Sequence, residues 1–131
     1  MPISQIRPLV EWVETRMNLM LLPRPAIYIS DTAIQRLASF DADSDGTRKI
    51  GAYHSGMIYI SSDYWQPGNI ADDSVIIHEL VHYAQDIGYD TYACANAREY
   101  EAYNLQNAYL AQHGERPIID ADDLAALAHC P

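Results

Sequence analysis

The segment His78-Glu79-Leu80-Val81-His82 constrains this chain more than any other. The surrounding apolar residues recur at helical spacing and predict a helix over residues 74–87, with one face made of Ile76, Ile77, Leu80, Val81 and Ala84. Residues four apart on a helix lie one above the other, so both histidines share the opposite face. Asp72 and Asp73 stand where the N-cap of this helix belongs, and Gly88 is a fitting end to it.

Two imidazoles one helical turn apart can bind the same ion, which makes His78 and His82 candidate metal ligands. Glu79 projects beside them, where it is placed to hold and deprotonate a metal-bound water rather than to bind the metal. Zinc, one ion per chain, is the expected metal for two histidines and a carboxylate with a fourth position open to water. The pattern alone occurs by chance in unrelated proteins, but its helical context and apolar face favour a metal site over core packing.

A third protein ligand is expected from the long helix predicted over residues 96–113. That helix carries two candidate carboxylates, Glu99 and Glu101. They lie about 200° apart around the helix axis, so only one of them can face the metal.

The segment Glu99-Tyr100-Glu101-Ala102-Tyr103 resembles the Glu-x-x-Ala-Asp helix that follows the HExxH motif in the integral-membrane prenyl-protein proteases and the related heat-shock membrane proteases. The resemblance covers roughly residues 50–110 and implies Glu99 as the third zinc ligand, as in gluzincins. Tyr103 replaces the aspartate that holds a ligating imidazole in those proteases. We expect its hydroxyl to accept that hydrogen bond, less strongly than a carboxylate does. The membrane-spanning parts of those proteases have no counterpart here.

The rest of the sequence predicts a single α+β domain over residues 1–131, a minimal zincin in which a small antiparallel hairpin or sheet packs on the motif helix and the ligand helix. The other expected elements are helices over 3–20, 32–40 and 122–129, a strand over 26–30, and a hairpin of 50–54 with 57–61. Met57–Ile60 is the expected edge strand, where a peptide substrate would add as a further strand. The acidic turn 41–46 begins like a calcium loop but has Ala52 where the bidentate glutamate belongs.

The resemblance implies a metallopeptidase that hydrolyses peptide bonds with metal-activated water and Glu79 as general base. The alternative is a non-catalytic, protein-binding module that zinc merely stabilises, which the small size of the chain favours. Glu79 argues against that alternative, because a structural site needs ligands and no adjacent base.

Charge limits the partners. With 18 acidic and 8 basic residues, the net charge of −10 repels nucleic acid and favours protein or peptide partners, including basic ones. No apolar run is long enough to span a membrane. The N-terminus lacks a signal-peptide pattern, which leaves a cytoplasmic protein or a mature exported form. Cys94 and Cys130 either form a disulfide or remain two buried thiols, and the sequence leaves both open.

Overall fold

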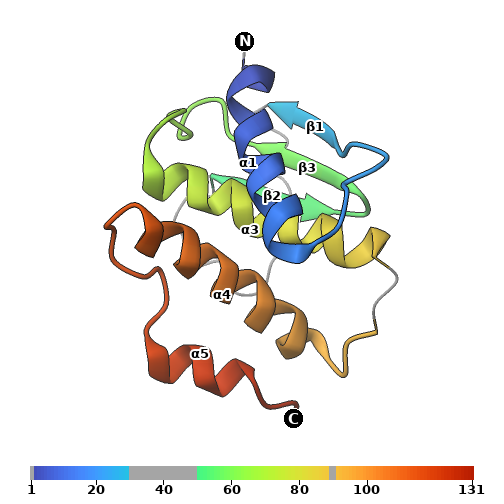
Figure 1. The fold of residues 1–131 in the computed structure, drawn as a ribbon, viewed down its shortest axis with the longest axis vertical. Helices are drawn as coiled ribbons and strands as arrows, with labels where there is room; N and C mark the ends of the chain where they lie inside the picture. Colours follow the sequence, from blue (N-terminus) through green and yellow to red (C-terminus); the bar gives the residue numbers. More distant parts are fainter. Residues whose placement is uncertain (1, 30–49, 89–90) are drawn as a thin grey trace.

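The computed structural model describes residues 2–29, 50–88 and 91–131, and this part of the chain has the expected α+β class (Figure 1). The described elements are α1 (Pro2–Met17), β1 (Ala26–Ile29), β2 (Gly51–His54), β3 (Met57–Ile60), α3 (Ile70–Ile87), α4 (Ala95–Gln112) and α5 (Ala121–Leu127). The helix expected over 32–40 and the acidic turn 41–46 lie outside the described residues. No helix within the described ranges is long and apolar enough to cross a membrane.

Among the described residues, the sheet has three strands in the order β1-β3-β2. The expected hairpin is confirmed: β2 and β3 pair antiparallel around Ser55 and Gly56, both of which have positive φ. The expectation that Met57–Ile60 forms an edge was wrong, because β1 pairs with β3 in parallel and makes it the central strand. The part of the sheet that the structure describes is therefore mixed, with β1 and β2 at its edges and β2 beside α3.

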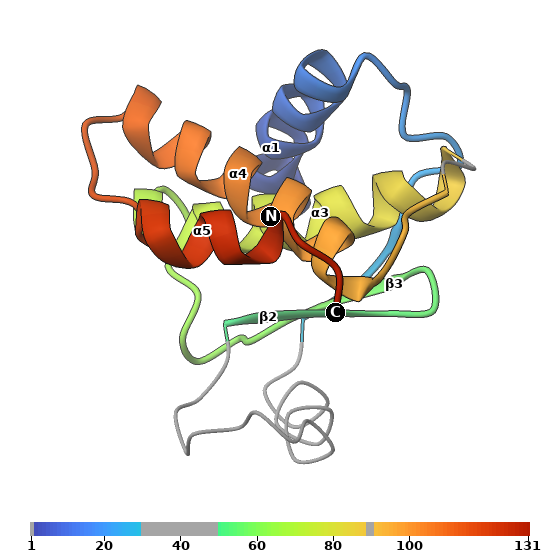
Figure 2. The same cartoon turned by 90° about the horizontal axis from the view of Figure 1, so that it is seen from below.

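The register explains why β1 joins the sheet. Ile27 and Ile29 lie opposite Ile58 and Ile60, so one face of the two strands is aliphatic and faces the helices. Burying each large aliphatic side chain contributes roughly 1.5–3 kcal/mol, which favours this pairing over an exposed β3. The described helices α1, α3, α4 and α5 lie on one side of β2 and β3 (Figure 2).

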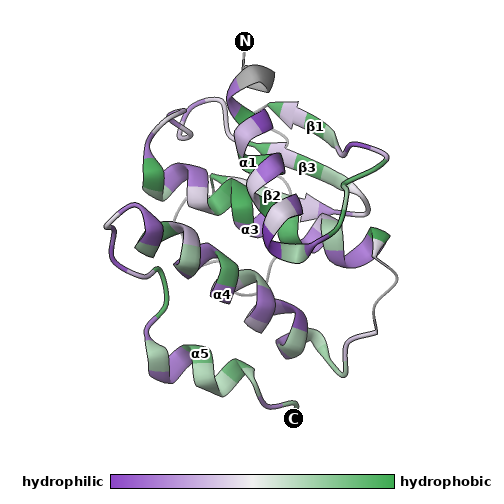
Figure 3. Cartoon of the chain, in the orientation of Figure 1, coloured by the Kyte–Doolittle hydropathy of each residue, from purple (hydrophilic) through white to green (hydrophobic). Residues whose placement is uncertain are grey.

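Helix α3 is the centre of the fold, because it packs against the sheet, α1 and α4. Hydrophobic residues are visible along α3 and the strands behind it (Figure 3). The apolar face expected for α3 is fully buried, with zero exposure at Ile76, Ile77, Leu80 and Val81. This packing leaves the helix little freedom to rotate, so the opposite face, with the histidines, is held toward α4.

Helix α3 begins four residues before the predicted start. Its N-cap is Asn69, whose side chain accepts a hydrogen bond from the backbone N–H of Asp72. Asp73, one of the two expected caps, is instead buried and accepts hydrogen bonds from Trp65 Nε1 at 3.0 Å and from the N–H of Gly68 at 3.2 Å. Its carboxylate therefore fastens the preceding turn to the first turns of the helix.

The C-terminal segment lies along the outer side of α4 and is held mainly by polar and covalent links. Helix α5 has no buried residue. Cys94 and Cys130 form a disulfide, and Asn96 donates to the backbone carbonyl of His129 at 3.1 Å. The disulfide thus ties the chain's end to the start of the helix that carries Glu99.

Candidate metal centre

The two histidines and Glu79 lie together on α3, as the motif predicts. The rings of His78 and His82 are 4.9 Å apart between centroids. One potential ligand atom from each of His78, Glu79 and His82 lies within 4.8 Å of the other two. His78 is 9% exposed and Glu79 is 8% exposed, so the cluster is largely shielded from water.

Glu99 reaches this cluster from α4. Its Oε1 lies 2.5 Å from His82 Nε2, and its Oε2 lies 3.4 Å from His78 Nε2. Two imidazoles from one helix and a carboxylate from the next therefore converge at a single point. The structure brings Glu99 to the histidines, as the resemblance implies.

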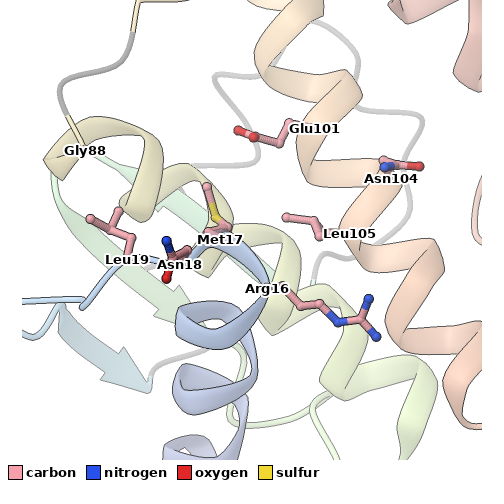
Figure 4. Close-up of a pocket in the computed structure, with 8 residues that line it drawn as sticks. All are labelled: Arg16, Met17, Asn18, Leu19, Gly88, Glu101, Asn104 and Leu105. Carbon is pink, nitrogen blue, oxygen red and sulfur yellow. The ribbon is translucent and has the colours of Figure 1, made fainter.

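Glu101 faces a different part of the molecule. Its Oε1 accepts hydrogen bonds from Gln85 Nε2 at 3.0 Å and from the hydroxyl of Tyr92 at 2.6 Å. It also lines a groove of about 480 Å³ between the ends of α1 and α3 and the middle of α4, together with Arg16, Met17, Asn18, Leu19, Gly88, Asn104 and Leu105 (Figure 4). Glu101 lies on the far side of Gln85 from the histidines.

A chain of hydrogen bonds fixes which ring nitrogen of His78 carries the proton. The hydroxyl of Ser74 donates to the carbonyl of Ala71 at 2.7 Å, so its oxygen accepts from Gln106 Nε2 at 3.1 Å. The amide of Gln106 is thereby oriented with Oε1 toward His78 Nδ1, at 2.9 Å. An amide oxygen can only accept, so Nδ1 carries the proton. In the neutral ring, Nε2 then turns its lone pair toward Glu99.

Gln85 fixes His82 in the same way. Its Nε2 donates to the carbonyl of Arg98 at 2.9 Å and to Glu101, which orients the amide. Its Oε1 accepts from His82 Nδ1 at 2.9 Å and from Arg98 Nε at 3.0 Å. Both histidines therefore hold the proton on Nδ1, the arrangement found in most metal-binding histidines.

This donor set fits a zinc ion. Two neutral Nε2 lone pairs facing a carboxylate repel one another unless a cation or a proton lies between them. Two imidazoles and one carboxylate are the ligands of many catalytic zinc sites, which leave a further position for water. The side chain of Glu99 is 36% exposed, whereas those of His78 and His82 are 11% and 12% exposed, so Glu99 is the candidate ligand nearest to solvent.

Sequence reasoning missed Gln106 and expected Tyr103 to hold an imidazole. Gln106 accepts the Nδ1 proton of His78, whereas the ring of Tyr103 packs edge-on against His78 at 4.5 Å between centroids. The signal for Gln106 was its position seven residues after Glu99, which places both on the same face of α4.

The sequence also offers the loop tyrosines Tyr89 and Tyr92, near the end of the motif helix, as candidates for steadying an oxyanion. Tyr92 uses its hydroxyl proton on Glu101, and Tyr89 lies outside the described residues. His54, the last residue of β2, is an exposed surface histidine.

Comparison with known proteins places the chain in a family. A family model described as "Domain of unknown function (DUF6647)" matches residues 2–131. The chain belongs to this family. No curated protein and no solved structure matches it. Because the DUF6647 match spans α3 and α4, the histidines, Glu79 and Glu99 all lie within the family's own domain.

The charges at the cluster are coupled. Burial alone lowers the pKa of His82, but hydrogen bonds and charge, chiefly from Glu99 and further from Gln85 and Glu79, outweigh burial and raise it above its usual value. Burial likewise raises the pKa of Glu99, but hydrogen bonds from His78 and His82 outweigh it and hold that pKa well below its usual range. Without metal, the charge of Glu99 therefore favours the protonated form of His82.

We expect the metal-free protein to be most stable between about pH 4.3 and 6.5, the ordinary pKa values of glutamate and histidine. The raised pKa of His82 stabilises the fold below about 6.5, and this contribution is lost as pH rises through the folded-state value. The lowered pKa of Glu99 stabilises the fold above about 4.3, and this contribution is lost as pH falls.

Urea unfolding in the presence of a chelator, from pH 4 to 9, measures this dependence. Glu99→Gln removes the charge and is the reference curve, so the difference between the two curves isolates the pair. A wild type that gains stability over Glu99→Gln as pH rises from 6.5 to 9 contradicts the expectation.

Proposed function

We propose that this chain is a zinc-dependent metallopeptidase in which His78, His82 and Glu99 bind one zinc ion. The observation that carries the proposal is the convergence of two Nε2 atoms and a carboxylate beside Glu79. Zinc held by these three residues would polarise the scissile carbonyl and lower the pKa of a bound water. Glu79 is the general base that accepts the water's proton and passes it to the leaving amine.

Substrate placement follows from the sheet. Within the described ranges, β2 pairs only with β3, and β2 lies beside the motif helix α3. A peptide substrate can therefore join the other edge of β2 as an antiparallel strand. A Cβ added to Gly51 of β2 would lie 3.4 Å from Cγ of Glu79, so this strand runs directly beside the base. The net charge of −10 favours basic peptides over acidic ones.

The rival function is a protein-binding module in which zinc only stabilises the fold. Glu79 favours the peptidase, because its carboxylate lies within the cluster while Glu99 supplies the third ligand. Partial exposure of Glu99 points the same way, since structural zinc sites are closed by four protein ligands.

The test is metal content together with a peptide-library screen. We expect about one zinc per chain and cleavage that a chelator abolishes and added zinc restores. Zinc binding with no cleavage of any library peptide or unfolded protein would favour the module. Absence of zinc would overturn both functions.

A further inference from the structure

Arg98 precedes Glu99 on α4 and lies across the end of α3. Its Nε donates to Gln85 Oε1 at 3.0 Å, and its terminal nitrogen lies 2.9 Å from Asp86 Oδ1. Its backbone carbonyl accepts from Gln85 Nε2 at 2.9 Å. Arg98 therefore contacts Gln85 from both sides, and Gln85 holds the Nδ1 proton of His82.

The same network continues to the edge strand. The second oxygen of Asp86, Oδ2, accepts a hydrogen bond from the hydroxyl of Tyr53 on β2. That hydroxyl also accepts from the N–H of Gly56 at 3.1 Å, within the hairpin turn. Burial, the hydrogen bond to Asp86 and the charge of Asp86 raise the pKa of Tyr53 to about 12, so the phenol keeps the proton it donates. The ring of Tyr53 lies 6.2 Å from that of His82.

We propose that Arg98 is a positioning residue that joins the zinc ligand His82 to the substrate-binding strand β2. One guanidinium bonds Gln85 and Asp86 at once, and these two residues hold His82 and Tyr53 respectively. The inference rests on the proposed function, since it assumes zinc at His82 and peptide along β2. No part of it requires Arg98 to touch metal or substrate.

Arginine suits this role in a way that lysine does not. Its planar group presents several N–H donors in fixed directions, whereas a lysine ammonium is a single point charge. An isolated ion pair as exposed as this one, with side chains 34% and 41% exposed, contributes little to stability. We therefore expect loss of the Arg98–Asp86 pair to change the orientation of His82 more than the free energy of unfolding.

The first test measures zinc affinity by competition with a chromophoric chelator. We expect Arg98→Met to weaken zinc binding about 10–100-fold, the range for partners that orient a ligating histidine. The absorption bands of the cobalt-substituted protein should change as well, because they report ligand geometry. Arg24→Met is the matched control. Arg24, in the loop after α1, pairs with Glu14 of that helix, so this variant should leave both readouts unchanged.

A second pair of variants separates positioning from folding. Arg98→Lys keeps the charge but cannot bond Gln85 and Asp86 at once, so it should weaken zinc binding by about tenfold. This variant tests the role of Arg98 even if Arg98→Met does not fold. Tyr53→Phe removes the hydroxyl that bonds Asp86 and Gly56 but leaves the contacts of Arg98 with Gln85, so it should raise KM for peptides severalfold with zinc affinity unchanged.

The two proposals fail in different ways. A wild type without zinc overturns the proposed function. A wild type that binds zinc, with Arg98→Lys or Arg98→Met binding it equally well and with unchanged cobalt spectra, overturns only the role of Arg98. Loss of stability without loss of zinc affinity likewise assigns Arg98 to the fold alone.

Discussion

Glu79→Gln is expected to lower kcat/KM for peptide hydrolysis by about 10²–10⁴-fold, the usual contribution of general acid–base catalysis. Glutamine has nearly the same shape but cannot accept the water's proton. The zinc content should remain near one per chain, because the proposed ligands are His78, His82 and Glu99. Cleavage of a fluorescence-quenched peptide gives the rate, and elemental analysis gives the metal content.

Glu115→Gln is a suitable control, because Glu115 is an exposed glutamate that follows α4 and is not part of the cluster. Its rate should equal that of the wild type. If Glu79→Gln cleaves as fast as the wild type, Glu79 is not the base. If it instead loses zinc, Glu79 is a ligand, and the carboxylate that completes the site has been assigned to the wrong residue.

Glu99→Gln is expected to weaken zinc binding by more than 100-fold. Replacing a residue that only orients a ligand costs 10–100-fold, and losing a charged ligand costs more. Glu101→Gln is the matched variant on the same helix, and its effect should stay within tenfold. Its amide oxygen still accepts from Gln85 and Tyr92, and it lies away from the histidines.

Both zinc affinities can be measured by chelator competition, with thermal unfolding of the metal-free proteins as a check on folding. The reverse order, with Glu101→Gln losing zinc and Glu99→Gln keeping it, would show that α4 turns when metal binds. Equal affinities in both variants would mean that neither glutamate is a ligand.

The sequence predicted the elements whose causes are local. The period of apolar residues in α3 and the turn at Ser55 and Gly56 are encoded by neighbouring residues, and both were found near their correct places. The start of α3 was misplaced because Asp72 and Asp73 are also good cap residues. Asn69 is the N-cap because Trp65 Nε1 donates to the carboxylate of Asp73, which is then not available to cap the helix.

Features that depend on distant contacts could not be read in this way. The pairing of β1 with β3 joins strands separated by more than 25 residues, and no local pattern favours parallel over antiparallel pairing there. The partner of His78 depends on how α3 and α4 cross, which places Gln106 and not Tyr103 behind the ring. The disulfide between Cys94 and Cys130 depends on α5 folding back along α4.

Gly51 sets how closely the edge strand β2 approaches the proposed base Glu79. A Cβ at this residue would lie 3.4 Å from both Glu79 Cγ and Val75 Cγ1, so even alanine would fill the space between this strand and Glu79. On the side of β2, the gap to Glu79 is thus set by the backbone of Gly51 and not by a movable side chain. A peptide bound along β2 would meet Glu79 at the same depth whatever its sequence, so selectivity would depend on residues to either side of the scissile bond.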